Sequence, residues 1–114
     1  MLPKINRLTK KRDFEKVFKK GKRFGKDFLV LKLKENNLKE SRFGFIISRK
    51  ISKRAVLRNK IKRRLSEIVK MELKKMKKGI DAALIVCPGL EKKNFREMEE
   101  ILNKLFKKAG IMNF

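Results

Sequence analysis

Residues 55 to 65 are Ala55-Val56-Leu57-Arg58-Asn59-Lys60-Ile61-Lys62-Arg63-Arg64-Leu65. The apolar residues of this stretch and of the chain after it recur at three- and four-residue steps, namely Leu57, Ile61, Leu65, Ile68, Val69 and Met76. No Gly or Pro interrupts them. This spacing predicts one long amphipathic helix from about Ala55 to Lys77, ended by Gly79.

Cations surround the first two turns of this predicted helix. On a helical wheel of about 100° per residue, Arg58 and Lys62 flank the apolar stripe on one side. Lys60 and Arg64 flank it on the other side, and Arg63 points away from it. Guanidinium groups and the N–H groups at the start of a helix both favour phosphate oxygens, so this end of the helix is predicted to bind phosphates.

The positive charge of the chain is concentrated around the same stretch. The 114 residues include 35 Lys and Arg against 12 Asp and Glu, a net charge of +23. Residues 41 to 66 hold ten basic and no acidic residues, so this window alone carries +10. Such a charge favours counterion-releasing contacts with a polyanion, which makes nucleic acid the leading partner and an anionic membrane surface the second. The scattered lysines elsewhere are interpreted as ordinary solvated surface.

Composition excludes several other classes of protein. With 41% hydrophobic residues the chain can bury one core, and its length suits a single domain over residues 1–114. The absence of histidine removes the commonest zinc ligand and acid–base group, and the single Cys87, interpreted as a small core residue, cannot form an internal disulfide. No segment has the length of a membrane span or the pattern of a signal peptide, so we expect a soluble, cytoplasmic protein.

The first half of the chain predicts a helix followed by a hairpin. Thr9 is placed to cap a helix over residues 10–20, which Gly21 ends. From Phe24 the pattern changes to alternation and favours a strand that runs through Phe28. After a polar turn, residues 42–48 are predicted to return beside that strand as the second arm of a hairpin.

The second half adds a strand and a helix to the long helix. Residues 82–86 predict a short buried strand. Asn94 and Glu97 have the spacing of a capping box, and they open a last helix that ends at Gly110. The apolar face of that helix is predicted to consist of Phe95, Met98, Leu102, Leu105, Phe106 and Ala109. The fold class is therefore α+β, an α/β sandwich with its helices on one sheet.

The side chains provide no credible active site. Asp13 and Glu15 lie two residues apart on a helix and so point to different faces, and no Gly-rich phosphate loop is present. We therefore expect no catalytic residue and no metal ligand. The nine phenylalanines offer a different chemistry, because one or two of them beside basic residues such as Arg12 would stack unpaired bases. For any single phenylalanine, a place in the core is the alternative.

One family matches these features in order and spacing. Residues Ile46-Ile47-Ser48-Arg49-Lys50, followed by the stretch 55–65, resemble the protein subunit of bacterial ribonuclease P and its RNR motif. Asp13-Phe14, Val17-Phe18 and Phe43-Gly44 agree as well. The resemblance implies the order αβββαβα with a left-handed βαβ crossover, similar to the second domain of the fifth protein of the small ribosomal subunit.

The resemblance also implies a function. In that family a catalytic RNA subunit holds the Mg²⁺ ions and cleaves precursor tRNA at its 5′ end, and no cofactor is expected on the protein itself. The residues implied to bind the RNA subunit are Lys50, Lys53, Arg54, Arg58, Asn59, Lys62, Arg63 and Arg64. Those implied to bind the single-stranded 5′ leader are Arg12, Phe14, Phe18 and Phe28. No obligate protein partner and no membrane are implied.

The chain departs from the family pattern at three places. Ser52-Lys53-Arg54 stands in a turn that often contains Gly, Ser66 replaces a common arginine, and Leu31 replaces a common aromatic residue. Three other functions stay open on composition alone. A ribosomal or ribosome-assembly protein would have a similar fold and charge, but it would not need to bind a leader. DNA compaction is the next alternative. A membrane-surface role is the weakest, because it requires an apolar stripe that this chain uses in its core.

Overall fold

The mixed α+β order predicted from the sequence is confirmed. The computed structural model describes residues 2–112. Its elements are the 3-10 helix η1 Lys4–Asn6, α1 Lys11–Lys20, β1 Lys22–Lys26, β2 Leu29–Glu35, β3 Arg42–Ile47, α2 Ala55–Glu72, the 3-10 helix η2 Leu73–Lys75, β4 Ile80–Val86, the 3-10 helix η3 Leu90–Lys92 and α3 Phe95–Ala109. Without the 3-10 helices, the order is αβββαβα.

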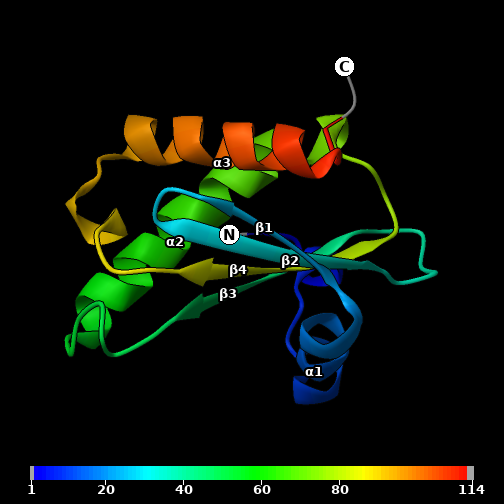
Figure 1. The fold of residues 1–114 in the computed structure, drawn as a ribbon, viewed down its shortest axis with the longest axis horizontal. Coiled ribbons are helices and arrows are strands. Elements are labelled where there is room, and N and C mark those ends of the chain that lie inside the picture. Colours follow the sequence, from blue (N-terminus) through cyan, green and yellow to red (C-terminus); the bar gives the residue numbers. More distant parts are fainter. Residues whose placement is uncertain (1, 113–114) are drawn as a thin grey trace.

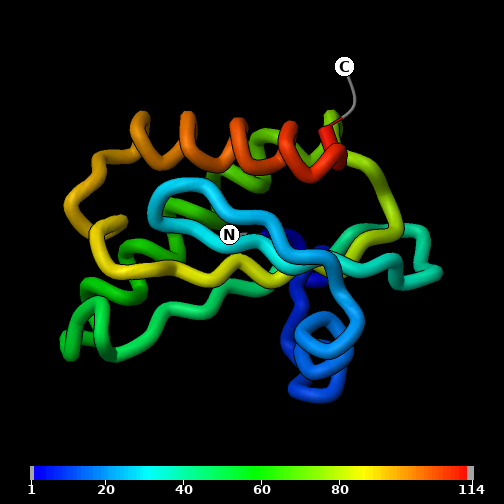
Figure 2. Tube along the Cα trace, in the orientation of Figure 1, coloured from blue at the N-terminus to red at the C-terminus, as the bar shows by residue number. Residues whose placement is uncertain are grey.

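The predicted hairpin has the wrong partner. The four strands lie in the order β1-β2-β4-β3, and the hairpin joins β1 to β2 through a turn in which Asp27 has a positive φ of 48° (Figure 2). Residues 42–48 instead supply β3, which pairs in parallel with β4. Six of the seven residues of β4 are buried, so this apolar strand takes the central position between β2 and β3. The α2 helix makes the crossover from β3 to β4.

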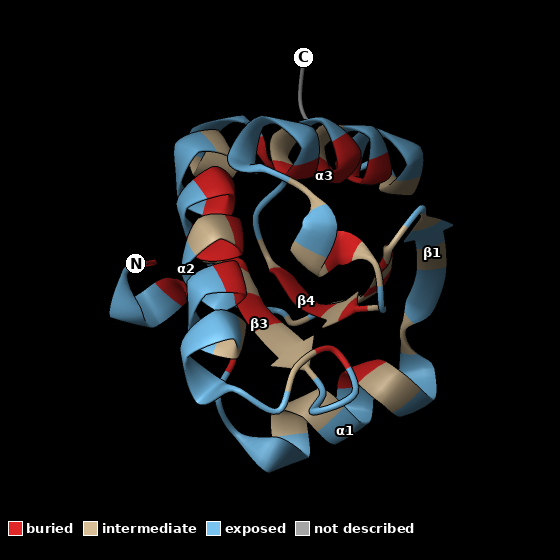
Figure 3. Cartoon of the chain, turned by 90° about the vertical axis from the view of Figure 1, so that its left-hand side faces the viewer, coloured by how far each residue is buried: buried red, intermediate tan, exposed pale blue. Residues whose placement is uncertain are grey.

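Helices cover both faces of the sheet, whereas the sequence pattern predicts them on one face only. In Figures 1 and 3, α2 and α3 lie over one face and α1 lies against the other. Fully buried Leu29 and Leu31 of β2 belong to the main core beneath α2 and α3. A second small core of Leu8, Val17 and Ala83 lies under α1. Alternate residues of each strand therefore serve two different cores.

The long helix is confirmed and begins at Ala55 as predicted, but it ends earlier than predicted and its first turn is more exposed. Ile61, Leu65, Ile68 and Val69 are buried in the main core, as expected. The helix ends at Glu72, where η2 continues the chain to the buried Met76. Leu57 is 40% exposed, because the first turn of α2 extends beyond the end of the sheet (Figure 1). Phe95, also predicted in the core, is 36% exposed at the first position of α3.

The predicted caps of α3 are confirmed, whereas the predicted cap of α1 and the predicted core position of Cys87 are not. The capping box is present, since Asn94 Oδ1 accepts the Glu97 N–H at 2.9 Å and Glu97 Oε1 accepts the Asn94 N–H at 3.1 Å. Gly110 ends α3 with a left-handed φ of 74°. Thr9 does not cap α1, because the N-cap is Lys10 and no side chain caps that helix. Cys87 is half-buried after β4, outside the main core, and its N–H donates to the Phe28 carbonyl.

Candidate nucleic-acid interface

The residues predicted to bind the RNA subunit lie together on the loop after β3 and on the first three turns of α2. We call them the α2 cationic surface: Lys50, Lys53, Arg54, Arg58, Asn59, Lys62, Arg63 and Arg64. All are exposed except Arg58 and Arg64, which are half-buried. Within residues 2–112 none of them forms an ion pair. The first turn of α2 has no acidic residue and no side-chain cap, so its N–H groups add to the attraction for phosphates.

Serine hydroxyls hold the loop that leads into this surface. Ser48 Oγ accepts the Lys50 N–H at 3.2 Å, and Ser52 Oγ accepts the Arg54 N–H at 3.1 Å. Arg58 Nη1 donates to the Ser52 carbonyl at 2.8 Å. These bonds define the path of the loop without the glycine that the family often has there. They also give Arg58 a structural role in addition to its charge.

Arg42 belongs to the acid-free window but not to the interface. Its guanidinium donates two hydrogen bonds to Asp81, at 2.8 and 2.6 Å, and a third at 3.3 Å to Asp13 on α1. The hydrogen bond to Asp81 is the main reason why the pKa of Arg42 is raised above its ordinary value. Arg42 therefore joins α1 to the sheet, and its charge is neutralised within the fold.

Two of the predicted leader residues form an aromatic pair on α1. The rings of Phe14 and Phe18 stack at a centroid distance of 6.3 Å and an interplanar angle of 25°. Phe14 lies directly over Gly44, where an added Cβ would be 2.2 Å from its Cζ. Lys32 Nζ lies 5.5 Å from the Phe18 centroid and donates to the Phe18 carbonyl. Both rings are half-buried, so part of each ring is open to solvent.

A row of aliphatic side chains continues this surface across the sheet. Val30 pairs with Ile85, and Ile85 pairs with Ile46, so the three side chains lie side by side on the face that α1 covers. The α1 helix packs on the adjacent row at Gly44 and Ala83 and leaves these three residues half-buried. The aromatic sheet face is defined here as Phe14, Phe18, Val30, Ile46 and Ile85.

The other two residues predicted to bind the leader are placed differently. Arg12 is exposed in the first turn of α1. Phe28 lies in the β1–β2 turn and packs against the main core, with Lys93 Nζ 5.4 Å from its centroid. Its ring also occupies the space beside Gly89, where an added Cβ would be 2.4 Å away. The structure thus separates Phe28 from Phe14 and Phe18, which lie against the opposite face of the sheet.

Sequence reasoning missed Lys32 and the row of Val30, Ile85 and Ile46. Alternation indicates that Val30 and Lys32 face away from Leu29 and Leu31. The row itself depends on the register of β4 between β2 and β3, and no local signal in the sequence gives that register.

The chain is similar to known proteins of one family. The family model Ribonuclease P matches residues 2–110. The ribonuclease P protein component of Pseudanabaena sp. is 37% identical over 114 residues, covering 99% of this chain and 98% of that protein. That of Syntrophomonas wolfei is 40% identical over 111 residues, covering 97% of this chain and 92% of that protein.

Solved structures show the same fold. The Staphylococcus aureus RNase P protein has a TM-score of 0.88 and 28% identity, covering 95% of this chain and 98% of that one. The Thermotoga maritima RNase P protein has a TM-score of 0.82 and 32% identity, covering 90% and 96%.

Fold and surface together define a small, basic RNA-binding protein of a ribonucleoprotein that processes tRNA. Its two candidate binding surfaces are a cationic helix and an aromatic sheet face. Among residues 2–112, no helix is long and apolar enough to cross a membrane. The chain belongs to the ribonuclease P protein family.

Proposed function

We propose that this chain binds the catalytic RNA of ribonuclease P through the α2 cationic surface. The observation that carries the proposal is the set of cations on α2 and its preceding loop that have no ion-pair partner within residues 2–112. Unpaired cations of this density repel one another in the free protein, and a phosphate backbone relieves that repulsion. Guanidinium groups supply bidentate hydrogen bonds to phosphate.

The aromatic sheet face binds the single-stranded 5′ leader of precursor tRNA. Phe14 and Phe18 offer π surfaces to unpaired bases, and the row of Val30, Ile85 and Ile46 extends that surface across the sheet. Lys32 and the exposed Arg12 supply charge for the leader backbone. Mature tRNA lacks a leader, so this contact distinguishes substrate from product.

The chemistry of cleavage resides in the RNA subunit, with Mg²⁺ held mainly by that RNA. Residues 2–112 contain no group of three His, Cys, Asp or Glu side chains that could hold a metal ion. The donor set therefore does not fit a resident metal, and we assign no step to one on the protein. The protein acts by positioning two RNAs, and its place of action is the cytoplasm, where precursor tRNA is made.

Single-turnover cleavage of a precursor tRNA by a bacterial ribonuclease P RNA at low Mg²⁺ tests this function. Addition of the protein is expected to restore cleavage at the 5′ end of the mature tRNA. The matched comparison is a substrate with a one-nucleotide leader, which should gain less from the protein than a long-leader substrate. The proposal is wrong if the protein binds the RNA subunit tightly but restores no cleavage with any RNA-subunit type.

A further inference from the structure

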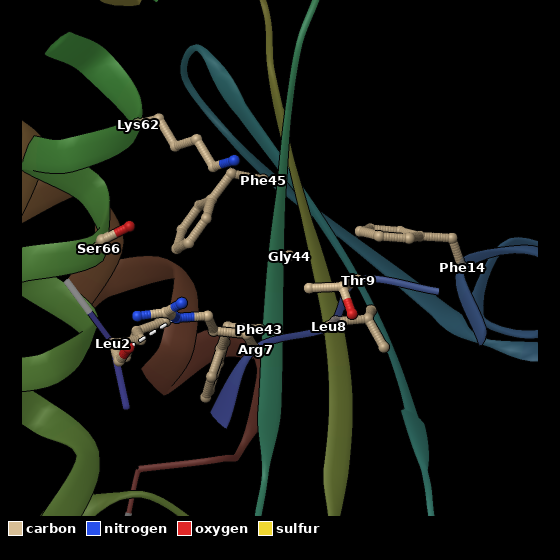
Figure 4. Close-up of a pocket in the computed structure, with 10 residues that line it drawn as sticks. All are labelled: Leu2, Arg7, Leu8, Thr9, Phe14, Phe43, Gly44, Phe45, Lys62 and Ser66. Atoms are coloured by element: carbon tan, nitrogen blue, oxygen red, sulfur yellow. Dashed lines mark hydrogen bonds between the residues drawn. The ribbon is translucent and has the colours of Figure 1, made fainter. Parts of the chain in front are cut away.

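A hollow runs around the open edge of β3, between the two surfaces described above. It encloses about 350 Å³, within the lower part of the size range of small-ligand sites. On the α2 side its walls are Arg7, Phe43, Phe45, Lys62 and Ser66, and on the α1 side it reaches Phe14 (Figure 4). We call this space the β3-edge hollow.

We propose that the β3-edge hollow binds one unpaired nucleotide of the catalytic RNA subunit, with its base against Phe45. The proposal rests on the assembly with that RNA proposed above, and it adds a site for a single nucleotide to a surface of phosphate contacts. Phe45 is half-buried, and Figure 4 shows its ring between α2 and β3, facing the hollow. A base has a π face that such a ring can stack on, whatever the base is.

Ser66 places a hydroxyl at the wall of the hollow. Its side chain lies on α2, and the residue is only 4% exposed. Its hydroxyl forms no hydrogen bond with any of residues 2–112, and the oxygen itself is not fully buried, so it is open to the hollow. Such a hydroxyl can donate to or accept from a polar atom of a bound base or a ribose 2′-hydroxyl.

The open edge of β3 offers further polar groups. The Phe43 carbonyl accepts the Leu8 N–H at 2.9 Å, so the backbone groups of Phe43 point away from β4. Backbone groups of successive strand residues point to alternate sides, so those of Phe45 point to the same edge. The N-terminal segment pairs with this edge only as far as Leu8. The N–H and C=O of Phe45 are therefore placed to contact the edge of a base.

Charge around the hollow selects RNA over an apolar ligand. Lys62 extends from α2 toward Phe45 at the mouth of the hollow, and it also belongs to the α2 cationic surface (Figure 4). Its ammonium can contact the phosphate of a nucleotide whose base enters the hollow. Continuity with the α2 surface assigns that nucleotide to the RNA subunit, because α2 is the element proposed to bind it.

Photocrosslinking tests the site directly. A benzophenone amino acid is placed at position 45, the holoenzyme is assembled with a bacterial ribonuclease P RNA and precursor tRNA, and the crosslinked nucleotides are mapped. The expected result is a crosslink at one unpaired position of the RNA subunit. Crosslinks to the leader of the precursor would overturn the assignment to the RNA subunit, and crosslinks to neither RNA would overturn the site.

Conservative variants give an independent measurement. Phe45→Leu keeps an apolar side chain and removes the π face, and it is expected to weaken binding of the RNA subunit by about 5- to 150-fold. Phe24→Leu is the matched control, because Phe24 is a half-buried phenylalanine of β1 at the opposite edge of the sheet. Ser66→Ala is expected to weaken binding without unfolding the chain. If Phe45→Leu and the wild type bind the RNA subunit with equal affinity, the proposed site is wrong. If the wild type itself does not bind the RNA subunit, the proposed function is wrong instead.

Discussion

At the scale of single residues, the contact between Gly44 and Phe14 fixes the position of α1. No side chain other than hydrogen fits at Gly44, because an added Cβ would lie 2.2 Å from Phe14 Cζ and 3.0 Å from the Leu8 carbonyl oxygen. Gly44→Ala is therefore expected to displace the Phe14 ring and to destabilise the fold by about 1–3 kcal/mol, measured by urea unfolding. Gly25→Ala is the control, since an added Cβ there meets nothing within 4 Å.

A second substitution separates the steric effect from other causes. If the Phe14 ring is the obstacle, Gly44→Ala should cost less free energy in a chain that already carries Phe14→Ala. Additive effects of the two substitutions would contradict the assignment, because residues in direct contact are expected to couple.

Phe18 is the residue that best tests leader binding. Phe18→Ala is expected to lower the affinity of the holoenzyme for precursor tRNA by about 1–3 kcal/mol while the affinity for mature tRNA stays unchanged. Phe95→Ala is the matched control, because Phe95 is 36% exposed on α3 and lies outside the aromatic sheet face. Equal losses for both RNAs, or loss of the fold, would assign Phe18 to the core.

At the scale of elements, Arg42 connects three of them. It joins β3, to which it belongs, with Asp81 on β4 and Asp13 on α1. Arg42→Met is expected to destabilise the fold by about 2–4 kcal/mol, because the buried Asp81 loses both guanidinium hydrogen bonds. Arg42→Lys keeps the charge but not the bidentate geometry. Its stability, measured by thermal unfolding, should therefore lie between that of Arg42→Met and that of the wild type. If Arg42→Lys is as stable as the wild type, charge alone holds the elements together.

The α2 cationic surface is best tested at Arg63. The Arg58 side chain also holds the loop through its hydrogen bond to Ser52, whereas the Arg63 side chain forms no hydrogen bond or ion pair within residues 2–112. Arg63→Ala should lower the slope of log affinity for the RNA subunit against log salt by about one unit. The matched variant is Arg96→Ala, at an exposed position of α3, which should leave the slope unchanged. A slope that does not respond to Arg63→Ala would exclude Arg63 from the RNA contacts.

Among the elements, the sequence predicts those that depend on residues close together in the chain. It does not predict the strand pairings that depend on residues far apart. The sequence predicts α2 and the capping box of α3 correctly because the residues that form them are three or four positions apart. It pairs residues 42–48 with the wrong strand because the true partner, β4, lies about 40 residues later. The alternation that starts at Phe24 also does not separate β1 from β2, since Lys22-Arg23-Phe24-Gly25-Lys26 has the polar composition of an edge strand.

The same limit applies to the candidate site. The α2 cationic surface follows from consecutive residues on one helix and its preceding loop, so the sequence contains it almost completely. The aromatic sheet face combines α1 with three strands, and only the observed register brings Val30, Ile85 and Ile46 together. The same register, with α1 and α2 on opposite faces, separates Phe28 from the other residues predicted to bind the leader.

At the scale of the whole molecule, the two surfaces proposed to bind RNA meet at one edge of the sheet. The α2 cationic surface lies on one side of β3 and the aromatic sheet face on the other, and the β3-edge hollow connects them (Figure 4). An RNA strand can therefore pass from one surface to the other around a single strand edge. Under the proposed function, this geometry lets one small domain hold the RNA subunit and the leader at the same time.

A net charge of +23 on 114 residues gives salt two opposite effects. In the free chain, salt screens repulsion among the cations, so the free energy of unfolding should rise by on the order of 1 kcal/mol from about 50 to about 500 mM NaCl. Binding of the RNA subunit should weaken steeply over the same range, because releasing the same counterions into more concentrated salt gains less free energy. Urea unfolding and filter binding in the same buffers measure both.

A charge-reduced variant separates repulsion from other effects of salt. Replacing the exposed Lys74, Lys75 and Lys78 with Gln lowers the net charge from +23 to +20 and leaves the α2 cationic surface intact. The variant should be more stable than the wild type at low salt and should gain less stability as salt rises, while its RNA affinity changes little. If the stability of the wild type instead falls with salt, repulsion among the cations is not what limits the free chain, and relief of that repulsion cannot contribute to RNA binding.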